Sequence, residues 1–299
     1  MSQPAPVLAE GLARIQRDID SAFDALLPVP QDSRSKLIEA MRYAAIGGGK
    51  RLRPLLLVSV AELYGVDRHT AVRCGAAVES IHIYSLIHDD LPCMDDDDMR
   101  HGKPTLHKAY DEATAVLAGD AFQAFAFEVL SDPAVIGDPW TRADLVQALA
   151  CASGANGMVG GQMIDIVAEG GGFDLPMVTR LQQLKTGALL AASVEMGAIL
   201  GKLAPEGRNH LRAYSRDIGL AFQIADDLLD HEGDQAKAGK SLRKDAEANK
   251  QTFVSLLGAE RAREQARLLV DQAVDHLRQH GPEADLLRAL ARYIVERDH

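Results

Sequence analysis

Six aspartates stand within ten residues of this chain, as Asp89, Asp90 and the run 95–98. No Lys or Arg stands three or four residues from Asp89 or Asp90, so a helix would give neither of them a paired cation. Pro92 predicts a kink after the preceding apolar segment, which would fold Asp95 back toward the first two carboxylates. Oxygen ligands of this kind suit Mg²⁺, which uses few carboxylates and leaves room for phosphate oxygens. A solvated acidic loop is the alternative interpretation.

A second acidic motif, Asp226, Asp227 and Asp230, ends another long apolar segment. At about 100° per residue, these three side chains fall on one face of a helix. Again no Lys or Arg stands three or four residues away, and such carboxylates are unfavourable unless an external cation neutralises them. A helix end that frays into solvent is the alternative for this motif alone. Together the two motifs predict the two sides of a metal clamp for a diphosphate.

Basic residues near glycines offer partners for phosphate. The segment 47–54 reads GGGKRLRP and places Lys50, Arg51 and Arg53 at a predicted helix N-terminus. Three cations at the positive end of a helix dipole are unfavourable unless an anion binds there, and glycines let backbone amides approach a phosphate closely. The segment predicts an anion site, although a glycine-basic loop alone is a weak signal.

Further basic residues surround the first acidic run in the sequence. Arg100, His101 and Lys103 follow it, and they either bind phosphate or simply neutralise the run. His82 stands seven residues before Asp89, about two helical turns away on nearly the same face. We expect His82 to point toward the metal site, with a packed core histidine as the alternative.

Three lysines in the C-terminal half belong to the same set. Lys185 interrupts a long apolar helix, which is unusual for an ordinary surface lysine. Lys240 and Lys250 stand in a polar loop after the second acidic motif, where they could close over it as a lid.

Apolar residues recur at three- and four-residue steps along nearly the whole chain, which predicts helices rather than strands. The expected helices lie near 8–26, 35–45, 54–64, 70–90, 107–130, 139–155, 158–168, 175–201 and 207–231, followed by shorter ones to about 297. The segment 70–90 is nearly all apolar and is expected to be a central, buried helix. We therefore predict an all-α fold: a single domain over 1–299, built as a large helical bundle around that helix.

The net charge, the cysteines and the lengths of the apolar runs limit which partners and which cellular compartment we expect. The formal net charge of −11 argues against nucleic acid, although it is compatible with a local basic site for an anion. The three cysteines, Cys74, Cys93 and Cys151, form no CxxC pair and predict reduced thiols. The start of the sequence does not resemble a signal peptide, and no run of about 18 uncharged apolar residues predicts a transmembrane segment. We expect a soluble, cytoplasmic protein.

Taken together, these segments resemble a known enzyme family. The motifs that carry the resemblance are GGGKRLRP (47–54), ESIHIYSLIHDDLPCMDDDDMRHGKPT (79–105), GMVGGQMIDI (157–166), KTGALL (185–190), FQIADDLLD (222–230) and, more loosely, GKSLRKDAEANKQTF (239–253). They resemble the trans-isoprenyl diphosphate synthases, and most closely the bacterial-type farnesyl diphosphate synthases. The matches follow the family's order over nearly the whole chain.

The resemblance implies a role for most of the residues above, with three Mg²⁺ ions on an allylic diphosphate. The implied metal ligands are Asp89, Asp90, Asp95, Asp226, Asp227 and Asp230. Asp96, Asp97 and Asp98 are expected to orient Arg100 and neighbouring basic residues. The implied contacts of the allylic diphosphate are Arg100, Lys185, Asp226, Lys240 and Lys250, and those of isopentenyl diphosphate are Gly49, Lys50, Arg53, His82 and His101. The implied catalytic groups are Arg100, Lys185, Thr186 and Gln223, of which Thr186 and Gln223 would line the reacting carbons.

The sequence departs from the family pattern at two positions. His101 stands where the family usually has an Arg that contacts isopentenyl diphosphate, so a neutral imidazole would weaken binding and make it depend on pH. Val254 replaces a usual Pro, which puts the geometry of the loop near Lys250 in question.

The implied reaction is the head-to-tail condensation of isopentenyl diphosphate with dimethylallyl and geranyl diphosphate. A terpene cyclase shares the fold and the ionisation chemistry, but it needs no second diphosphate site. A non-catalytic subunit would be expected to have incomplete acidic motifs, and both motifs are complete here. The family also implies a homodimer.

Product length is expected to depend on the helix that precedes Asp89. Tyr84 stands five residues earlier, about 7.5 Å deeper at roughly 1.5 Å per residue, although a plain core role fits it equally well. In the family, an aromatic residue there, beside Ser85, and the four-residue insertion 91–94 resemble farnesyl synthases. We therefore predict a fifteen-carbon product, with the twenty-carbon geranylgeranyl diphosphate as the alternative.

Overall fold

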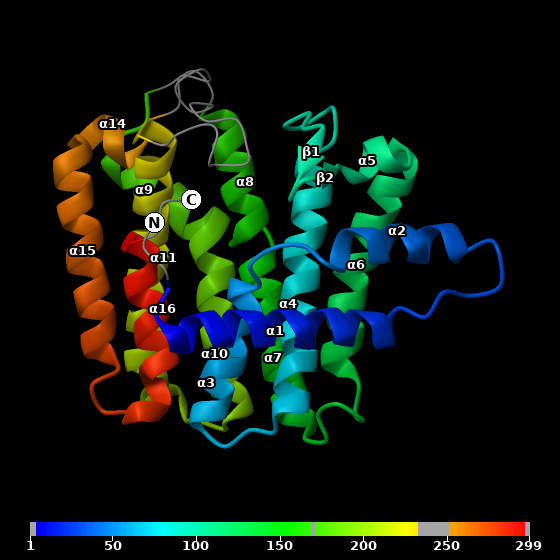
Figure 1. Cartoon of the computed structure of the whole chain (residues 1–299), viewed down its shortest axis with the longest axis horizontal. Helices are drawn as coiled ribbons and strands as arrows, with labels where there is room; N and C mark the ends of the chain where they lie inside the picture. Colours follow the sequence, from blue (N-terminus) through cyan, green and yellow to red (C-terminus); the bar gives the residue numbers. More distant parts are fainter. Residues whose placement is uncertain (1–3, 169–171, 233–250, 297–299) are drawn as a thin grey trace. The chain divides into compact units, whose positions relative to one another are not determined.

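The computed structural model describes residues 4–168, 172–232 and 251–296. Its backbone contacts divide the chain into two compact units, which we call the N-terminal unit (11–146) and the C-terminal unit (the first ten residues with 147–299). The boundaries fall within the helices α1 (Pro6–Leu26) and α7 (Pro139–Ser153). Each unit is described by itself, and the single domain over 1–299 stays a prediction. The prediction of an all-α fold is confirmed (Figure 1).

The N-terminal unit consists of helices and one small hairpin. After α1 come α2 (Ser35–Ala45), α3 (Leu52–Leu63), α4 (Arg68–Asp89), β1 (Met99–Arg100), β2 (Lys103–Pro104), α5 (Leu106–Ala109), α6 (Glu112–Ser131) and the start of α7. The two strands pair antiparallel, Arg100 opposite Lys103, a feature too short to leave a sequence pattern. The helix expected at 107–130 is broken at Tyr110, because Asp111 caps a new helix by accepting the Thr114 N–H.

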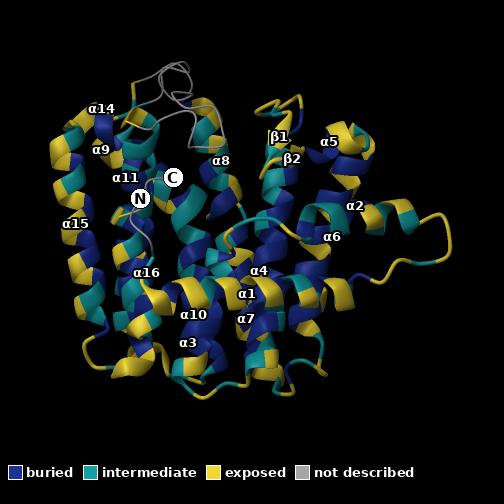
Figure 2. Cartoon of the chain, viewed as in Figure 1, coloured by how far each residue is buried: buried dark blue, intermediate teal, exposed yellow. Residues whose placement is uncertain are grey.

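Helix α4 is the buried helix of this unit, as predicted, and it packs against both α3 and α6 (Figures 1 and 2). Its N-terminus is capped by Asp67, which accepts the Thr70 N–H at 3.0 Å. At its C-terminus the chain turns, and the Asp95 N–H donates to the Asp89 carbonyl at 2.8 Å. The turn after Pro92 therefore returns Asp95 to the end of the helix, as the sequence indicated.

The C-terminal unit is also helical. It contains the rest of α7, α8 (Met158–Val167), α9 (Leu175–Gln182), a π turn (Gln183–Gly187), α10 (Ala188–Leu200), α11 (Asn209–Glu232), α14 (Phe253–Leu257), α15 (Ala259–His276) and α16 (Asp285–Glu296), with 3₁₀ turns at Pro205–Arg208 and Pro282–Ala284. Helix α11 packs mainly along α15, and α8 packs against the π turn. The single helix expected at 175–201 is thus interrupted by the π turn, which contains Lys185.

One helix in the described part of the chain, α6, is long and apolar enough to cross a membrane by length and composition alone. A core helix meets the same criteria, and the buried face of α6 packs along α4. The three cysteines are free thiols, as expected: Cys74 is buried, and Cys93 and Cys151 are exposed.

Candidate active site

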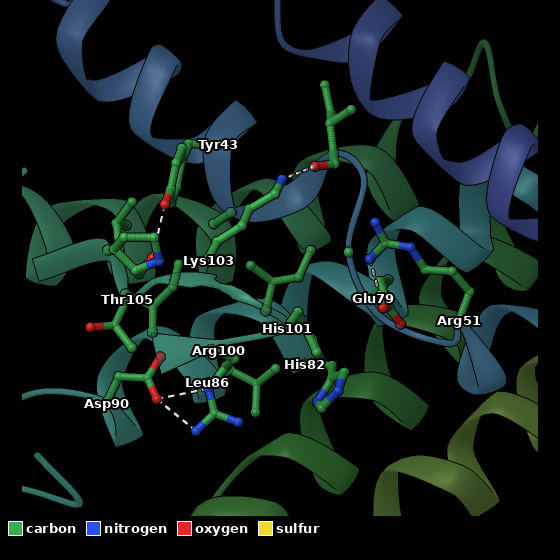
Figure 3. A pocket seen from close by; sticks show the side chains of 17 residues that line it. Tyr43, Arg51, Glu79, His82, Leu86, Asp90, Arg100, His101, Lys103 and Thr105 are labelled. Atoms are coloured by element: carbon green, nitrogen blue, oxygen red, sulfur yellow. Dashed lines mark hydrogen bonds and ion pairs between the residues drawn. The ribbon is translucent and has the colours of Figure 1, made fainter. Parts of the chain in front are cut away.

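A cavity in the N-terminal unit is lined by several of the basic residues that the sequence singled out, but not by Lys50 or Arg53 (Figure 3). It lies among the end of α2, the glycine segment, α4 and the β1–β2 hairpin. Its polar lining is Tyr43, Gly48, Arg51, Glu79, His82, Asp90, Arg100, His101, Lys103 and Thr105. The hairpin brings Arg100, His101 and Lys103 to the same cavity as His82, about twenty residues earlier in the sequence.

Arg51 anchors the wall of this cavity and is not one of its anion ligands. Its side chain is 2% exposed and pairs with Glu79, which is 3% exposed, at 2.9 Å and with Asp20 at 3.0 Å. It also donates to the Ala45 carbonyl. A buried guanidinium with two carboxylate partners holds the glycine segment against α4 and α1. Of the three cations predicted to bind the anion, Arg51 is therefore structural.

Lys50 and Arg53 lie where an anion would meet the N-terminus of α3. Lys50 is exposed and directly precedes the capping residue, and Arg53 lies half-buried in the first turn. Gly49 has φ = 75°, a left-handed backbone conformation that residues other than glycine rarely adopt. The first amides of a helix point outward without intrahelical partners, so this end combines backbone donors with two basic side chains.

Both histidines in the cavity are held neutral by their surroundings. Burial lowers the pKa of His82 well below its ordinary value, and the charges of Arg53, His101 and Arg100 add to the shift. Partial shielding from water, with Arg100 and Arg51 nearby, also lowers the pKa of His101. The His101 ring lies against the glycine segment: a Cβ on Gly48 would be 3.3 Å from its Nδ1. The lining therefore carries the charges of Arg51, Arg100 and Lys103, and Glu79 and Asp90 pair with the first two of these.

The first acidic motif lies at the C-terminal end of α4. Asp89 is half-buried and Asp95 exposed. Asp90 is 3% exposed and accepts from the Arg100 Nε at 2.7 Å. Burial raises the pKa of Asp90, and the paired guanidinium opposes that shift. Asp90 therefore holds Arg100 in this structure, and Asp95 is the exposed carboxylate beside the end of the helix.

Two of the remaining three aspartates of the run, Asp97 and Asp98, engage basic residues. Asp97 lies 3.5 Å from the Arg100 guanidinium, and Asp98 pairs with Lys108 at 2.9 Å. The exposed Asp96 adopts a positive φ of 48°, where the loop reverses. These contacts fix the loop that carries Asp95.

Tyr84 and Ser85 lie one turn before the acidic end of α4. Tyr84 is 6% exposed, and its pKa is raised by burial and by the nearby Asp89 carboxylate, with Gln123 opposing the shift. Ser85 donates to the carbonyl of His82 at 2.8 Å and so stays bound to its own helix. Tyr84 is therefore the bulky group on this part of α4, and the role of either residue in product length stays a prediction.

In the C-terminal unit, Lys185 and Thr186 lie on the π turn between α9 and α10. Lys185 pairs with Asp165 of α8 at 2.7 Å. Helix α8 approaches this turn at Gly161, where a Cβ would lie 2.2 Å from the backbone nitrogen of Lys185. A π turn changes the direction of the side chains that follow it and is frequent at functional sites. The position of Lys185 depends on backbone contact as well as charge.

The second acidic motif lies near the C-terminal end of α11. Asp226 and Asp230 are half-buried. Asp227 is 7% exposed and accepts the backbone N–H of Phe253 at 2.7 Å, so it anchors the start of α14. Gln223, one turn earlier, is 8% exposed.

Val254 lies buried in the first turn of α14, which Thr252 and Ser255 close with a capping box. Lys240 and Lys250 lie outside the described residues.

The aspartates at the end of α4 are the candidate ligands of a divalent cation in the N-terminal unit. The described part of the chain contains no group of three or more His, Cys, Asp or Glu residues already arranged around one point. Within the N-terminal unit, a backbone hydrogen bond joins Asp95 to Asp89, so the two residues lie close together at the end of α4. Aspartate oxygens suit Mg²⁺, which takes its other ligands from water and phosphate. The residues therefore fit the metal; the clamp across both motifs stays a prediction.

Comparisons with known proteins decide the family. The family model described as "Polyprenyl synthetase" matches residues 34–292. The chain belongs to the polyprenyl synthetase family. Within it, the chain is 45% identical to the farnesyl diphosphate synthase of Escherichia coli over 93% of this chain and 94% of that one. It is also 44% identical to the chloroplastic geranylgeranyl pyrophosphate synthase of Catharanthus roseus, over 88% and 74% of the two chains.

A solved structure supports the same placement. An apo structure from Zymomonas mobilis, described as an FPP/GFPP synthase, superposes with a TM-score of 0.88 at 57% identity, covering 96% of this chain and 98% of that one. The resemblance inferred from the sequence motifs is therefore confirmed, as is the all-α fold that it implied.

Sequence reasoning missed two carboxylates that support the site. Glu79 lies on the apolar helix α4, and no Lys or Arg stands three or four residues from it, which is the same signal that marks Asp89. Asp165 stands within the motif GMVGGQMIDI, but nothing in the sequence shows that it meets Lys185. Pairings between separate helices depend on packing and cannot be read from spacing.

Proposed function

We propose that this member of the polyprenyl synthetase family is a Mg²⁺-dependent prenyltransferase that makes farnesyl diphosphate. The observation that supports this most directly is the basic N-terminus of α3, with Lys50 and Arg53, which is separate in the chain from the Lys185 turn. Two cationic sites suit two diphosphate substrates, as a condensation requires. A terpene cyclase binds one diphosphate and would leave the first site without a use.

In the proposed reaction each site positions one substrate. Lys50, Arg53 and the α3 N-terminus would bind isopentenyl diphosphate, with His82 and His101 beside it. Their charges hold the diphosphate and leave the double bond free to attack. The Gly49 backbone conformation lets the amides approach the phosphate closely.

The allylic substrate would lie at the acidic motifs. Asp89, Asp95 and Asp226 would hold Mg²⁺, which would supply positive charge to stabilise the departing diphosphate. Lys185 and Arg100 would bind the same diphosphate and stabilise the negative charge that grows on it. Arg100 is already oriented by Asp90, and Lys185 by Asp165.

The reacting carbons would lie beside Thr186 and Gln223, whose oxygen dipoles stabilise the allylic cation that forms when the carbon–oxygen bond breaks. The double bond of isopentenyl diphosphate then forms the new carbon–carbon bond, and a proton leaves the adjacent carbon. The described side chains near these positions include no obvious base, so we assign the proton to the released diphosphate.

The proposed product has fifteen carbons. Several relatives of similar length are farnesyl diphosphate synthases, including those of Escherichia coli and Haemophilus influenzae. The chain is also similar to geranylgeranyl pyrophosphate synthases and to the FPP/GFPP synthase of Zymomonas mobilis. A longer product is therefore the second candidate. We further propose a cytoplasmic homodimer, as implied by the family resemblance.

A single incubation tests the proposal. The purified protein is given Mg²⁺, dimethylallyl diphosphate and isopentenyl diphosphate, and the products are identified by mass spectrometry. Farnesyl diphosphate as the main product supports the proposal, and a twenty- or twenty-five-carbon main product corrects the chain length. A cyclic hydrocarbon from the allylic substrate alone, or no product at all, would overturn it. Lys50→Ala should raise the KM for isopentenyl diphosphate much more than that for the allylic substrate.

A further inference from the structure

His88, the residue before Asp89, is held across the interface between α4 and α6. Its Nε2 lies 3.1 Å from the backbone carbonyl of Val116. A carbonyl only accepts hydrogen bonds, so Nε2 must carry the proton and donate it. This fixes the tautomer and the plane of the imidazole ring on the side of α4 that faces α6.

The same ring contacts Tyr84, one helical turn earlier. The two ring centroids lie 5.8 Å apart with an interplanar angle of 75°, an edge-to-face contact. Such a contact contributes about 0.5–1.5 kcal/mol beyond the burial of the rings. Because His88 is itself tied to Val116, the contact restrains the Tyr84 ring on one side.

Gly119 of α6 makes this arrangement possible. A Cβ built on Gly119 would lie 2.1 Å from the His88 Nε2 and 2.5 Å from its Cδ2. No side chain larger than hydrogen fits there while the imidazole keeps its hydrogen bond. The three residues therefore form one unit, in which Gly119 admits His88 and His88 supports Tyr84.

We propose that His88 is a positioning residue for product length, acting through the orientation of Tyr84. This rests on the proposed function and deepens it, because Tyr84 is the bulky group beside the predicted path of the growing chain. The His88 ring occupies one side of the Tyr84 ring, so the Tyr84 ring cannot move in that direction. Without the His88 ring, the Tyr84 ring is free to move in that direction. The growing prenyl chain then has a longer path along α4.

The test is the ratio of twenty-carbon to fifteen-carbon product in a set of variants. Tyr84→Ala should raise the ratio most. His88→Ala should raise it several-fold. His88→Gln keeps a donor for Val116 but loses the ring, and His88→Phe keeps the ring but loses the donor; each should give an intermediate ratio. The ratio is measured per product formed, so a slower enzyme still reports it.

Two double variants distinguish positioning from a general loss of structure. The variant with both Tyr84→Ala and His88→Ala should give the ratio of Tyr84→Ala alone, because His88 then has nothing to position. Gly119→Ala alone should shift the ratio by displacing the imidazole. Combined with His88→Ala it should match His88→Ala alone, since the clash is gone. Gly137→Ala, at a glycine with no atom within 4 Å of the added carbon, is the matched control and should leave the ratio unchanged.

The outcomes separate this inference from the proposed function. If the wild-type protein forms no condensation product, the proposed function fails. If the wild-type protein condenses and Tyr84→Ala lengthens the product, but the His88 variants keep the wild-type ratio, only the inference is overturned. An additive effect in the variant with both Tyr84→Ala and His88→Ala would also overturn it, because His88 would then act independently of Tyr84.

Discussion

The two units hold their proposed functional groups by different physical means. In the N-terminal unit, buried ion pairs do so: Arg51 with Glu79, and Arg100 with Asp90. In the C-terminal unit, backbone geometry contributes more: the π turn carries Lys185, α8 touches that turn at Gly161, and Asp227 binds a backbone N–H. The ion pair between Lys185 and Asp165 adds to these backbone contacts.

This difference teaches where each unit is sensitive. A site held by buried charges fails when one partner is removed, because the other charge stays buried and unpaired. A site held by close backbone contact fails when a single carbon is added, because backbone atoms cannot move aside cheaply. The two acidic motifs nevertheless share one feature. In each, the second aspartate (Asp90 or Asp227) accepts a hydrogen bond from the protein, and the first (Asp89 or Asp226) is half-buried.

The largest effect should come from the first aspartate of each motif. Asp89→Ala and Asp226→Ala should each lower kcat on the order of 10³-fold, because each removes charge stabilisation from the leaving diphosphate. Steady-state kinetics with Mg²⁺ measures the loss, and circular dichroism should show an unchanged helical content. Wild-type turnover in either variant would exclude the two-sided clamp.

The second aspartates serve as controls for that comparison. Asp90→Asn and Asp227→Asn should lose less activity than the changes at Asp89 and Asp226, and each should also lower stability, because each aspartate binds a protein group. If Asp90→Asn loses as much turnover as Asp89→Ala with no loss of stability, Asp90 is primarily a metal ligand.

Arg51→Met should lower the free energy of unfolding by about 3–5 kcal/mol, because Glu79 would remain buried without its cation. Urea denaturation measures the change. Arg68→Met is the matched control: Arg68 also has two carboxylate partners, Asp18 and Glu62, but is more exposed, and its loss should cost about 1 kcal/mol or less. Equal losses would show that burial does not distinguish the two arginines.

Gly161→Ala tests the backbone contact in the C-terminal unit. The added carbon would lie 2.2 Å from the Lys185 nitrogen, so α8 or the π turn must shift, at roughly 1–3 kcal/mol. We expect kcat to fall roughly tenfold as Lys185 and Thr186 move. Gly207→Ala, at a glycine with open space, is the control in the same unit. If Gly161→Ala keeps both kcat and stability, the close approach does not position the turn.

Much of this arrangement could be predicted from the sequence, and the limits have physical reasons. The helices follow from apolar periodicity, which is local, and α4 and α11 lie close to the expected ranges. The return of Asp95 to Asp89 follows from Pro92. The π turn could not be predicted, because it reflects how α8 packs against the chain at Gly161.

The site shows the same division. The place of Lys50 and Arg53 before a predicted helix indicates an anion site, and the structure puts both at the N-terminus of α3. The same pattern includes Arg51, between them, because the sequence does not show which cation is buried. Its true partner, Glu79, stands 28 residues away on another helix. Spacing identifies residues that share an element, whereas ion pairs between elements require the fold.

The smallest predicted effect concerns His101, and it tests whether charge governs binding in the N-terminal cavity. Its pKa is lowered by shielding and by Arg100 and Arg51, so the ring is neutral near pH 7. A bound diphosphate would favour the protonated form. Binding of isopentenyl diphosphate should therefore strengthen as the pH falls toward the lowered pKa of the free His101 ring, because the ring then gains its proton more readily.

His101→Arg supplies that charge at every pH. Near pH 7.5 it should lower the KM for isopentenyl diphosphate by a few-fold, and this advantage over the wild type should shrink as the pH is lowered toward 5.5. The difference between the two pH profiles is the readout, because protonation of the substrate and of His82 affects both proteins. His101→Gln should show no such convergence with His101→Arg. Parallel profiles for the wild type and His101→Arg would mean that His101 does not gain a proton when the diphosphate binds.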